Sequence, residues 1–376
     1  MRIAIIAGEA SGDLLGAGLL EALRERYGTL EIEGIGGTQM QAQGCVSLYP
    51  IERLSVIGLV EAFGRLPELL PMRAKLARRF LEKPPDVFIG VDAPDFNLAL
   101  ARRLRAGGIT TAHYVSPSVW AWRRYRVKKI ARSIDLMMVL FPFEAEFYRQ
   151  HDLPVEFVGH PLADQIPESV DIHAARKALG IPIEGQYVAL LPGSRMSELK
   201  FLSSTMIETA HWLTMRYPRL RFLVPLVDHQ TKTYFREALH GARLGLDLTL
   251  FDGRSREVMS ACDVVLTASG TASLEAMLLK RPMVVIYRTT AISYAILKRW
   301  VGANIPHVAL PNLLAGTELV PEFLQQAAVP EKIGPRLLEF LREPNVPMNQ
   351  TFTDLHRELK RGASNRAANA IAELIA

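Results

Sequence analysis

The sequence predicts an α/β protein of two doubly wound, Rossmann-like domains, each built on a parallel sheet. Short apolar or β-branched runs recur along the chain, each ends in a loop rich in Gly, Ser, Pro or Asp, and a longer amphipathic stretch follows. This alternation is typical of parallel strands joined by crossover helices. A length of 376 residues exceeds what one core usually organises, and 49% hydrophobic residues supply enough apolar material for two cores.

The first sheet is expected within residues 1–165. Its expected strands are 2–7, 31–34, 86–91, 110–115, 135–139 and 155–158. Its expected helices are 14–27, 67–82, 96–106 and 144–151. Between 161 and 182 the pattern lapses into prolines and a short helix near 173–179, which indicates a domain boundary in this stretch.

The second sheet is expected within residues 166–345. Its expected strands are 187–191, 221–224, 248–251, 264–267 and 283–286, each followed by a helix. Residues 346–376 are expected to form C-terminal helices that either pack back on the first domain or exchange with a second copy in a homodimer. Because ligands of doubly wound sheets bind beyond the carboxyl ends of the strands, the two sheets are expected to face a cleft that holds the site.

Charge and composition narrow the class of function. The 44 Lys and Arg against 39 Asp and Glu give a net charge of +5, which suits anionic ligands or an acidic membrane surface but is too weak to indicate nucleic-acid binding. Cys45 and Cys262 are far apart and the nine histidines lack metal-ligand spacing, so we expect no disulfide, metal or cofactor. The first strand begins at residue 2 without a signal-peptide pattern, and no stretch reads as a spanning helix, so a cytoplasmic location is expected.

Two loops of the first domain carry candidate acid–base chemistry. In AGEASGD, at 7–13, a phosphate or sugar could approach the glycine backbone, or the loop is a tight turn in which Ser11 or Asp13 caps the next helix. In VDAPDFN, at 91–97, Asp92 lies where a strand ends and is the candidate general base. The alternatives are that Asp92 is a structural turn carboxylate and that Asp95 is a helix N-cap.

An aromatic and basic stretch follows in the same domain. The segment HYVSPSVWAW, at 113–122, continues into six arginines and lysines between 123 and 132. Ser116, Trp120 and Trp122 are candidates for contact with an acceptor or sugar. Such a surface suits a pyrophosphate, a sugar phosphate, anionic lipid headgroups or single-stranded nucleic acid, and the alternative is a solvated helix face.

The first loop of the second domain predicts a phosphate contact. LPGSR, at 191–195, places Gly193, Ser194 and Arg195 where the first strand of that domain ends. A guanidinium can bind a pyrophosphate through two parallel hydrogen bonds, which a lysine cannot do.

A second loop of this domain repeats the pattern. ASGTASLE, at 268–275, brings the small residues Ser269, Gly270 and Thr271 to the start of a helix, where free N–H groups favour an anion. Glu275, one turn later, could accept hydrogen bonds from the hydroxyls of a ribose. The alternative is that Ser273 or Thr271 caps the helix and Glu275 merely stabilises its first turn.

An apolar segment at 54–72, interrupted by glycine and proline, precedes four cations between 73 and 79. This combination is typical of a segment that lies on a membrane surface, and equally of a helix that packs under the first sheet. The residues expected to contact a membrane or acyl chains are Val56, Leu59, Leu66, Leu69, Leu70, Met72 and Arg73.

Five segments of the chain form a specific combination. They are AGEASGD (7–13), VDAPDFN (91–97), HYVSPSVWAW (113–122), LPGSR (191–195) and LPNLLAG (310–316). Together they resemble the signatures of the lipid-A-disaccharide synthase family, bacterial glycosyltransferases with the two-Rossmann-domain architecture called GT-B. The segments occur in family order over nearly the whole chain, and the tryptophan-containing stretch and LPNLLAG are not general Rossmann features.

The resemblance implies a metal-independent, inverting hexosyltransferase. Its donor would be UDP-2,3-diacylglucosamine, its acceptor the 6-hydroxyl of 2,3-diacylglucosamine 1-phosphate (lipid X), and its products a β-1,6-linked disaccharide 1-phosphate and UDP. Direct displacement requires a base on the acceptor side and stabilisation of the leaving diphosphate on the other. The residues that match family positions are Asp92 as the essential carboxylate, Arg195, Glu275 and Asn312 on the UDP side, and Glu9 and Ser11 in the first loop.

The resemblance also gives the apolar segment a purpose. Because both implied substrates carry acyl chains, we expect segment 56–72 to dock on the cytoplasmic face of the inner membrane, aided by Arg73, Arg78 and Arg79.

Two other functions stay open. One is another UDP-N-acetylhexosamine enzyme of the same architecture, either the peptidoglycan glycosyltransferase or a 2-epimerase. The other is a non-catalytic protein that binds lipid or RNA through the stretch 120–132.

Overall fold

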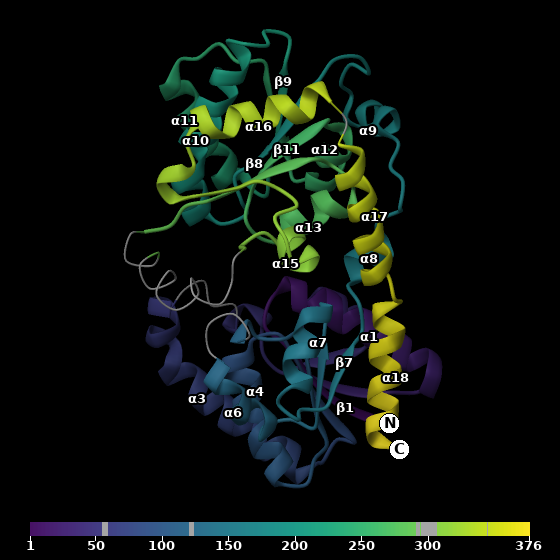
Figure 1. Ribbon diagram of the computed structural model, residues 1–376. Helices are drawn as coiled ribbons and strands as arrows, with labels where there is room; N and C mark the ends of the chain where they lie inside the picture. The colour runs from purple at the N-terminus through teal and green to yellow at the C-terminus, as the bar shows by residue number, and fades with distance from the viewer. Residues whose placement is uncertain (55–58, 120–123, 291–293, 295–306, 344) are drawn as a thin grey trace. The chain divides into compact units, whose positions relative to one another are not determined.

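The computed structural model divides the chain into two α/β units (Figure 1). It describes residues 1–54, 59–119, 124–290, 294, 307–343 and 345–376, with the backbone alone at 59–66 and 124. Unit 1 comprises Met1–Asp164 and Leu359–Ala376, and unit 2 comprises Gln165–Glu358. Residues 346–358 belong to unit 2 and residues 359–376 to unit 1.

In the described part of unit 1, seven parallel strands form one sheet in the order β3-β2-β1-β4-β5-β6-β7. They are β1 (Arg2–Ala7), β2 (Glu31–Ile35), β3 (Cys45–Ser47), β4 (Val87–Val91), β5 (Thr111–Tyr114), β6 (Leu136–Val139) and β7 (Val155–Phe157). All six strands expected in this half are present. Strand β3 was not expected, because three residues at a sheet edge are too few to show a period.

The helices of this unit are α1 (Ala10–Tyr27), α2 (Thr38–Ala42), α3 (Leu59–Glu82), α4 (Pro94–Ala106), α6 (Val127–Ala131), α7 (Pro142–Arg149) and α18 (Ala363–Ile375), with 3-10 turns at Ile51–Arg53 and Arg124–Arg126. Helix α8 (Pro161–Gln165) leads into unit 2. The expected start of α3 at residue 67 is wrong, because the helix continues through Pro67 and Pro71. Both prolines are exposed and lie one turn apart, so the carbonyl groups that lose an N–H partner face solvent.

Helix α18 packs along α1 within unit 1, as Figure 1 shows. Gly18 permits the close approach, since a Cβ there would lie 2.6 Å from Ser364 Oγ. The Asp164 carboxylate accepts the N–H groups of Gly362 and Ala363 at 2.8 and 2.7 Å, which fixes the start of α18. The side chains of Ala367, Ala368 and Ile371 then complete the core that α1 forms with the sheet. In this chain, residues 363–375 therefore pack back on the first unit.

In the described part of unit 2, six parallel strands form a sheet in the order β10-β9-β8-β11-β12-β13. They are β8 (Tyr187–Leu191), β9 (Arg221–Leu226), β10 (Leu248–Asp252), β11 (Val264–Ala268), β12 (Met283–Tyr287) and β13 (Glu322–Leu324). The helices are α9 (Ile172–Leu179), α10 (Met196–Thr214), α11 (His229–Ala242), α12 (Ser255–Ala261), α13 (Thr271–Leu278), α15 (Leu310–Ala315), α16 (Pro330–Arg342) and α17 (Val346–Leu359), with a 3-10 turn at Gln325–Ala327. The five expected strands are present, and only the short edge strand β13 was not expected.

The strand order reverses at one point in each sheet. In unit 1 the reversal lies between β1 and β4, and in unit 2 it lies between β8 and β11. The chain leaves such neighbouring strands towards opposite faces, so the loops beyond their carboxyl ends diverge and leave room for a ligand. These four loops are the ones that begin at residues 8, 92, 192 and 269, and all four carry candidate site residues.

Asp13 does not cap α1, which was one alternative for the first loop. Helix α1 begins at Ala10, and the Asp13 side chain, only 4% exposed, accepts the N–H groups of Gly37, Gln39 and Met40 at 2.8, 2.9 and 3.1 Å. The carboxylate therefore ties the loop after β2 to α1 and satisfies the start of α2.

We expect Asp13→Ala to lower the free energy of unfolding by about 2 kcal/mol, because buried N–H groups lose their acceptor. Urea unfolding followed by circular dichroism measures the change. Glu21→Ala, on an exposed position of the same helix, is the control and should change stability by less than about 0.5 kcal/mol. Equal losses in the two variants would contradict this role for Asp13.

Candidate functional site

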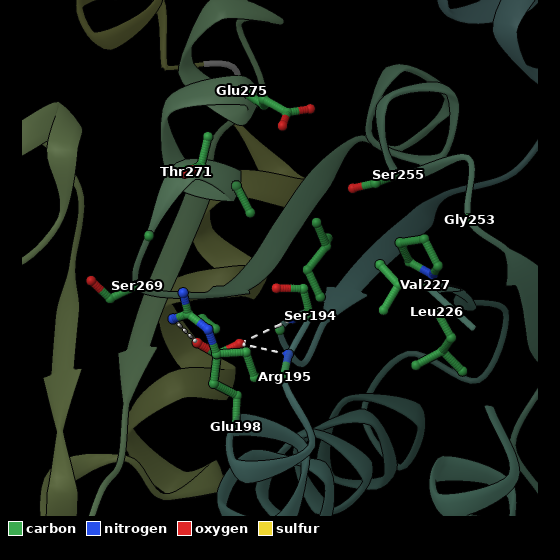
Figure 2. A pocket seen from close by; sticks show the side chains of 16 residues that line it. Ser194, Arg195, Glu198, Leu226, Val227, Gly253, Ser255, Ser269, Thr271 and Glu275 are labelled. Carbon is green, nitrogen blue, oxygen red and sulfur yellow. Dashed lines mark hydrogen bonds and ion pairs between the residues drawn. The ribbon is translucent and has the colours of Figure 1, made fainter. Parts of the chain in front are cut away.

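A pocket of about 350 Å³ lies beyond the carboxyl ends of the strands in unit 2 (Figure 2). It is built from the loop after β8, the start of α10, the ends of β9 and β10, and the loop from β11 into α13. Its lining residues are Leu191, Gly193, Ser194, Arg195, Glu198, Pro225, Leu226, Val227, Gly253, Ser255, Ala268, Ser269, Gly270, Thr271, Ala272 and Glu275. The structure thus brings together seven of the residues predicted to bind UDP, from two segments more than seventy positions apart in the sequence.

The loop after β8 folds around the carboxylate of Glu198. The N–H groups of Ser194 and Arg195 donate to Glu198 Oε2 at 3.0 and 3.2 Å, as the dashed lines in Figure 2 show. Gly193 has a φ of 106°, and a Cβ there would overlap the same carboxylate. The Arg195 side chain is 61% exposed and lies 3.7 Å from Glu198 Oε1, a weak ion pair that leaves the guanidinium available to a ligand.

The loop after β11 exposes the first turn of α13. Gly270 precedes the helix with a φ of 147°, a conformation that favours glycine. Ser273 Oγ donates to the Gly270 carbonyl at 2.7 Å and Ser269 Oγ donates to the Val308 carbonyl at 2.9 Å. No side chain caps the helix in the described structure, so the alternative of a Ser273 or Thr271 cap is not realised. The initial N–H groups of α13 instead lie at the pocket wall, where they favour an anion.

Glu275 supplies the second carboxylate of the pocket. Its side chain projects from α13 into the lining and is half-buried. Burial raises the pKa of this carboxyl above its usual range, and the nearby Arg256 opposes the shift. A partly desolvated carboxylate of this kind suits hydroxyl donors better than a second anion.

Asn312 is placed apart from these residues. It is fully buried at the start of α15 and does not line the pocket. Its Nδ2 donates to Val320 O and Glu322 Oε1 at 2.8 and 2.7 Å, and its Oδ1 accepts from the N–H groups of Leu319 and Val320 at 2.7 and 2.8 Å. The carboxamide is therefore saturated, and it holds the segment that leads into β13.

Sequence reasoning did not single out the opposite wall of the pocket. Pro225, Leu226 and Val227 end β9, and Gly253 and Ser255 follow β10. The available signal was positional, because β9 pairs with β8, β10 pairs with β9, and the carboxyl ends of these parallel strands lie at the same edge of the sheet. Apolar side chains there offered no chemical signal.

In unit 1, Asp92 begins a tight turn from β4 into α4. Asp92 and Ala93 have φ angles of 54° and 41°, in a region that residues other than glycine seldom adopt. Gly8 makes room for this turn, because a Cβ there would overlap the Cβ of Ala93. The turn places the Asp92 side chain beside Glu9 of the neighbouring β1 loop.

The environment of Asp92 suits a base. Burial and the negative charge of Glu9 raise the pKa of Asp92 to about 6, against a hydrogen bond from the Ala93 backbone, while a hydrogen bond with Glu9 adds to the rise. Ser11 Oγ donates to Glu9 Oε1, and both Glu9 and Ser11 are exposed. The structure therefore brings Glu9, Ser11 and Asp92 together at the reversal point of the first sheet.

The neighbouring candidates have defined partners. Asp95 is not the N-cap expected as an alternative, because α4 begins at Pro94 and Asp95 pairs with Arg126 from its first turn. Ser116 is buried and shares a 2.9 Å hydrogen bond with the Tyr148 hydroxyl. Trp120 and Trp122 lie outside the described residues.

The apolar segment of unit 1 is only partly described. Val56 lies outside the described residues, as do the side chains of Leu59 and Leu66. Met72 is buried in the core, Leu69 is half-buried and Leu70 is 48% exposed. Within the described residues, no helix has the length and apolar character needed to cross a bilayer. A search of the same residues finds no group of three or more His, Cys, Asp or Glu side chains suited to a metal ion.

Comparison with known proteins identifies the family. A family model described as lipid-A-disaccharide synthetase matches residues 3–375. The chain belongs to this family. Lipid-A-disaccharide synthases of Pseudomonas aeruginosa (strain UCBPP-PA14) and Azotobacter vinelandii are 51% and 52% identical to it over 375 residues, which cover 100% of this chain and 98% of each relative.

Solved structures agree on the fold. The UDP-GlcNAc 2-epimerase from Neisseria meningitidis bound to UDP-GlcNAc has a TM-score of 0.63 at 12% identity, over 99% of both chains. The glycotransferase of kitacinnamycin has a TM-score of 0.63 at 16% identity, over 99% of this chain and 98% of the other. At these identities the likeness shows the fold alone, and it confirms the expected α/β class of two Rossmann-like domains found in GT-B enzymes.

Proposed function

We propose that the chain transfers 2,3-diacylglucosamine from UDP-2,3-diacylglucosamine to the 6-hydroxyl of 2,3-diacylglucosamine 1-phosphate. The products are a β-1,6-linked disaccharide 1-phosphate and UDP, with inversion at the anomeric carbon. Family membership over the full chain supports this reaction. The observation that carries it is the unit 2 pocket, where the uncapped N-terminus of α13 and the Arg195 guanidinium meet.

The unit 2 pocket would hold the donor. The first turn of α13 and the Arg195 guanidinium would supply positive charge for a diphosphate, whereas the N–H groups at the start of α10 are bonded to the Glu198 carboxylate. Glu275 would accept hydrogen bonds from the ribose hydroxyls, and the apolar wall of Pro225, Leu226 and Val227 would support the uracil ring. Asn312 would act indirectly, through the segment that its carboxamide holds.

Asp92 would activate the acceptor. As the 6-hydroxyl oxygen attacks the anomeric carbon, its proton passes to the Asp92 carboxylate and the bond from that carbon to the diphosphate breaks. The electron pair of the broken bond leaves with UDP, whose charge Arg195 and the N-terminus of α13 would stabilise. A carboxyl group with a pKa of about 6 is ionised at neutral pH and is basic enough to take the proton as the alcohol reacts.

The alternative of a 2-epimerase rests on structural neighbours that share only the fold with this chain. An epimerase acts without an acceptor, so UDP release that depends on added 2,3-diacylglucosamine 1-phosphate separates the two functions. The assay uses purified protein and both acylated sugars without divalent metal. Release of UDP without formation of a disaccharide would reject the proposed transfer.

We also propose that α3 brings unit 1 to the cytoplasmic face of the inner membrane. Leu66, Leu69 and Leu70 share its N-terminal half, followed by exposed cations at Lys75 and Arg78. Arg79, by contrast, is held by the buried Glu33 through two hydrogen bonds of 2.9 and 2.7 Å. We further propose that the chain forms a homodimer, and the molecular mass measured by gel filtration tests this.

For Asp92, we expect activity to fall with acid below about pH 6, because the carboxyl becomes protonated and can no longer accept a proton. Asp92→Asn should lower kcat at least about 100-fold and abolish this acid limb. Asp95→Asn, three positions along and ion-paired to Arg126, is the control and should retain activity. An Asp92→Asn enzyme with near-normal kcat would reject the proposed base.

For Arg195, we expect Arg195→Lys to weaken UDP binding about tenfold, because a lysine keeps the charge but loses the two-pronged geometry. Isothermal titration with UDP measures the Kd. Arg216→Lys is the control, since Arg216 follows the other end of α10 and stacks on the Trp212 ring. Equal affinity in the Arg195→Lys and unaltered proteins would argue against a diphosphate contact.

For α3, the combined changes Leu66→Ser, Leu69→Ser and Leu70→Ser should reduce sedimentation with vesicles that contain anionic phospholipid, because the apolar surface is lost. Met215→Ser, which removes a side chain 68% exposed on unit 2, is the control. Circular dichroism verifies that each variant is folded. Sedimentation that stays unchanged in the triple variant would reject this surface.

A further inference from the structure

Asn97 lies beneath the turn that carries Asp92. It belongs to the first turns of α4 and is fully buried. Its Nδ2 is 2.7 Å from Asp92 O, 3.1 Å from Ile6 O and 3.4 Å from Val91 O. One side-chain amide group therefore spans the carboxyl ends of β1 and β4, the two strands between which the sheet reverses its order.

The turn at Asp92 needs such a support. Two successive residues with a side chain have positive φ angles, a conformation that is strained at both positions. Asp92 N donates to Tyr114 O at 2.9 Å and Asn97 N donates to Ala93 O at 3.0 Å. These bonds hold the flanks of the turn, whereas only the Asn97 side chain, among the described residues, reaches the carbonyl of Asp92 itself.

The packing around Asn97 leaves room for this contact. Gly90 on β4 lies directly against it, and a Cβ there would come within 2.8 Å of Asn97 Cβ and 2.9 Å of His113 Nδ1. The Asn97 Oδ1 has no partner among the described residues, so the donor side alone accounts for its polar contacts. The backbone ladder of β1 and β4 runs to Ala7 and Val91, and the Asn97 donor adds a link from the Asp92 turn just beyond it to Ile6 on β1.

We propose that Asn97 is a positioning residue that sets the separation of the Glu9 and Asp92 side chains by tying the Asp92 turn, just beyond the β1–β4 ladder, to the end of β1. Glu9 follows β1 and Asp92 follows β4, so both side chains extend from the backbone that Asn97 joins. This inference rests on the proposed role of Asp92 as a base, and it names Asn97 as the residue that orients the Asp92 side chain.

The consequence is electrostatic as well as geometric. The closeness of Glu9 is one of the causes that raise the pKa of Asp92, after burial. If the Asp92 turn moves away from the end of β1, water reaches the Asp92 carboxyl and the repulsion by Glu9 weakens. Both changes lower the pKa of Asp92 towards the ordinary range of an aspartate.

Other ionisable groups near this turn do not replace Glu9 in that role. Asp95 on α4 is paired with Arg126, and on the adjacent β5 burial lowers the pKa of His113 to about 3, which keeps it neutral. Tyr114, beside His113, is buried, and burial raises the pKa of its hydroxyl, so it is also neutral. Among the described groups, Glu9 is thus the charge to which Asp92 responds.

The test compares Asn97→Leu, which removes the donor at similar volume, with Asn97→Ser, which keeps a shorter donor and is the milder change for folding. We expect Asn97→Leu to lower kcat about 10- to 100-fold, because small displacements of a reacting group have effects of this size, while KM for the UDP-sugar changes by less than about twofold. Asn97→Ser should restore part of the loss. The acid limb of the pH profile should shift to lower pH by about one unit in Asn97→Leu.

Thr111→Val is the matched control. Thr111 is equally buried at the other end of the same sheet, where its hydroxyl donates to Asp135 Oδ2 at 2.9 Å. The change removes a buried hydrogen bond without touching the Asp92 turn, so it should cost stability but leave kcat and the acid limb in place.

A second readout separates this proposal from the proposed base. Carbon-13 NMR titration of the Asp92 carboxyl in the full chain reports its pKa without turnover. A lower pKa of Asp92 in Asn97→Leu or Asn97→Ser supports the positioning role of Asn97. This result stands even if Asp92→Asn keeps its activity, an outcome that would reject Asp92 as the base but not Asn97 as a positioning residue. An unchanged pKa and kcat in a folded Asn97→Leu, or an equal loss of kcat in Thr111→Val, would overturn the positioning role.

Discussion

The structure depends on the reversal of strand order in each parallel sheet. Between β1 and β4, and between β8 and β11, successive connections leave towards opposite faces, so backbone N–H groups and loop side chains are left without a covering helix. Asp92 with Glu9 occupies one reversal, and Arg195 with Ser269 and Thr271 occupies the other. The same constraint therefore produces an acidic pair in one unit and, in the other, a pocket lined by backbone amides, one guanidinium and two carboxylates.

Much of the fold could be read from hydrophobic period alone. Buried parallel strands such as Val87–Val91 and Val264–Ala268 are continuous apolar runs that end in loop residues, and these are strong local signals. The edge strands Cys45–Ser47 and Glu322–Leu324 could not be found this way, because three residues pair only once the neighbouring strand is in place. The expected start of α3 at residue 67 is too late, because the helix continues through Pro67, whose solvent-facing position tolerates the lost hydrogen bond.

The site divides in a similar manner. Arg195, Ser269, Thr271 and Glu275 combine chemistry with a place at a strand exit, so the sequence could indicate them, and all four line the pocket. Contacts that form only when a chain segment folds back on another leave no pattern of this kind in the sequence. In the sequence, Glu198 has the pattern of an ordinary helix residue, but in the structure the preceding loop donates two N–H groups to its carboxylate. Asn312 is predicted to bind a ligand, but in the structure its carboxamide is bonded to residues 319–322. Asn97 belongs to the same group, since its three carbonyl partners come from two strands that are distant in sequence.

The return of α18 to unit 1 has a consequence for biosynthesis. Ala367, Ala368 and Ile371 belong to the core that α1 shares with the first sheet, and Asp164 holds the start of their helix. When the ribosome has released only residues 1–164, the outer face of α1 is still an uncovered apolar surface. Unit 2, encoded between the two halves of its neighbour, can close its own core earlier. The core of unit 1 is thus complete only once residues 359–376 have been synthesised, after all of unit 2.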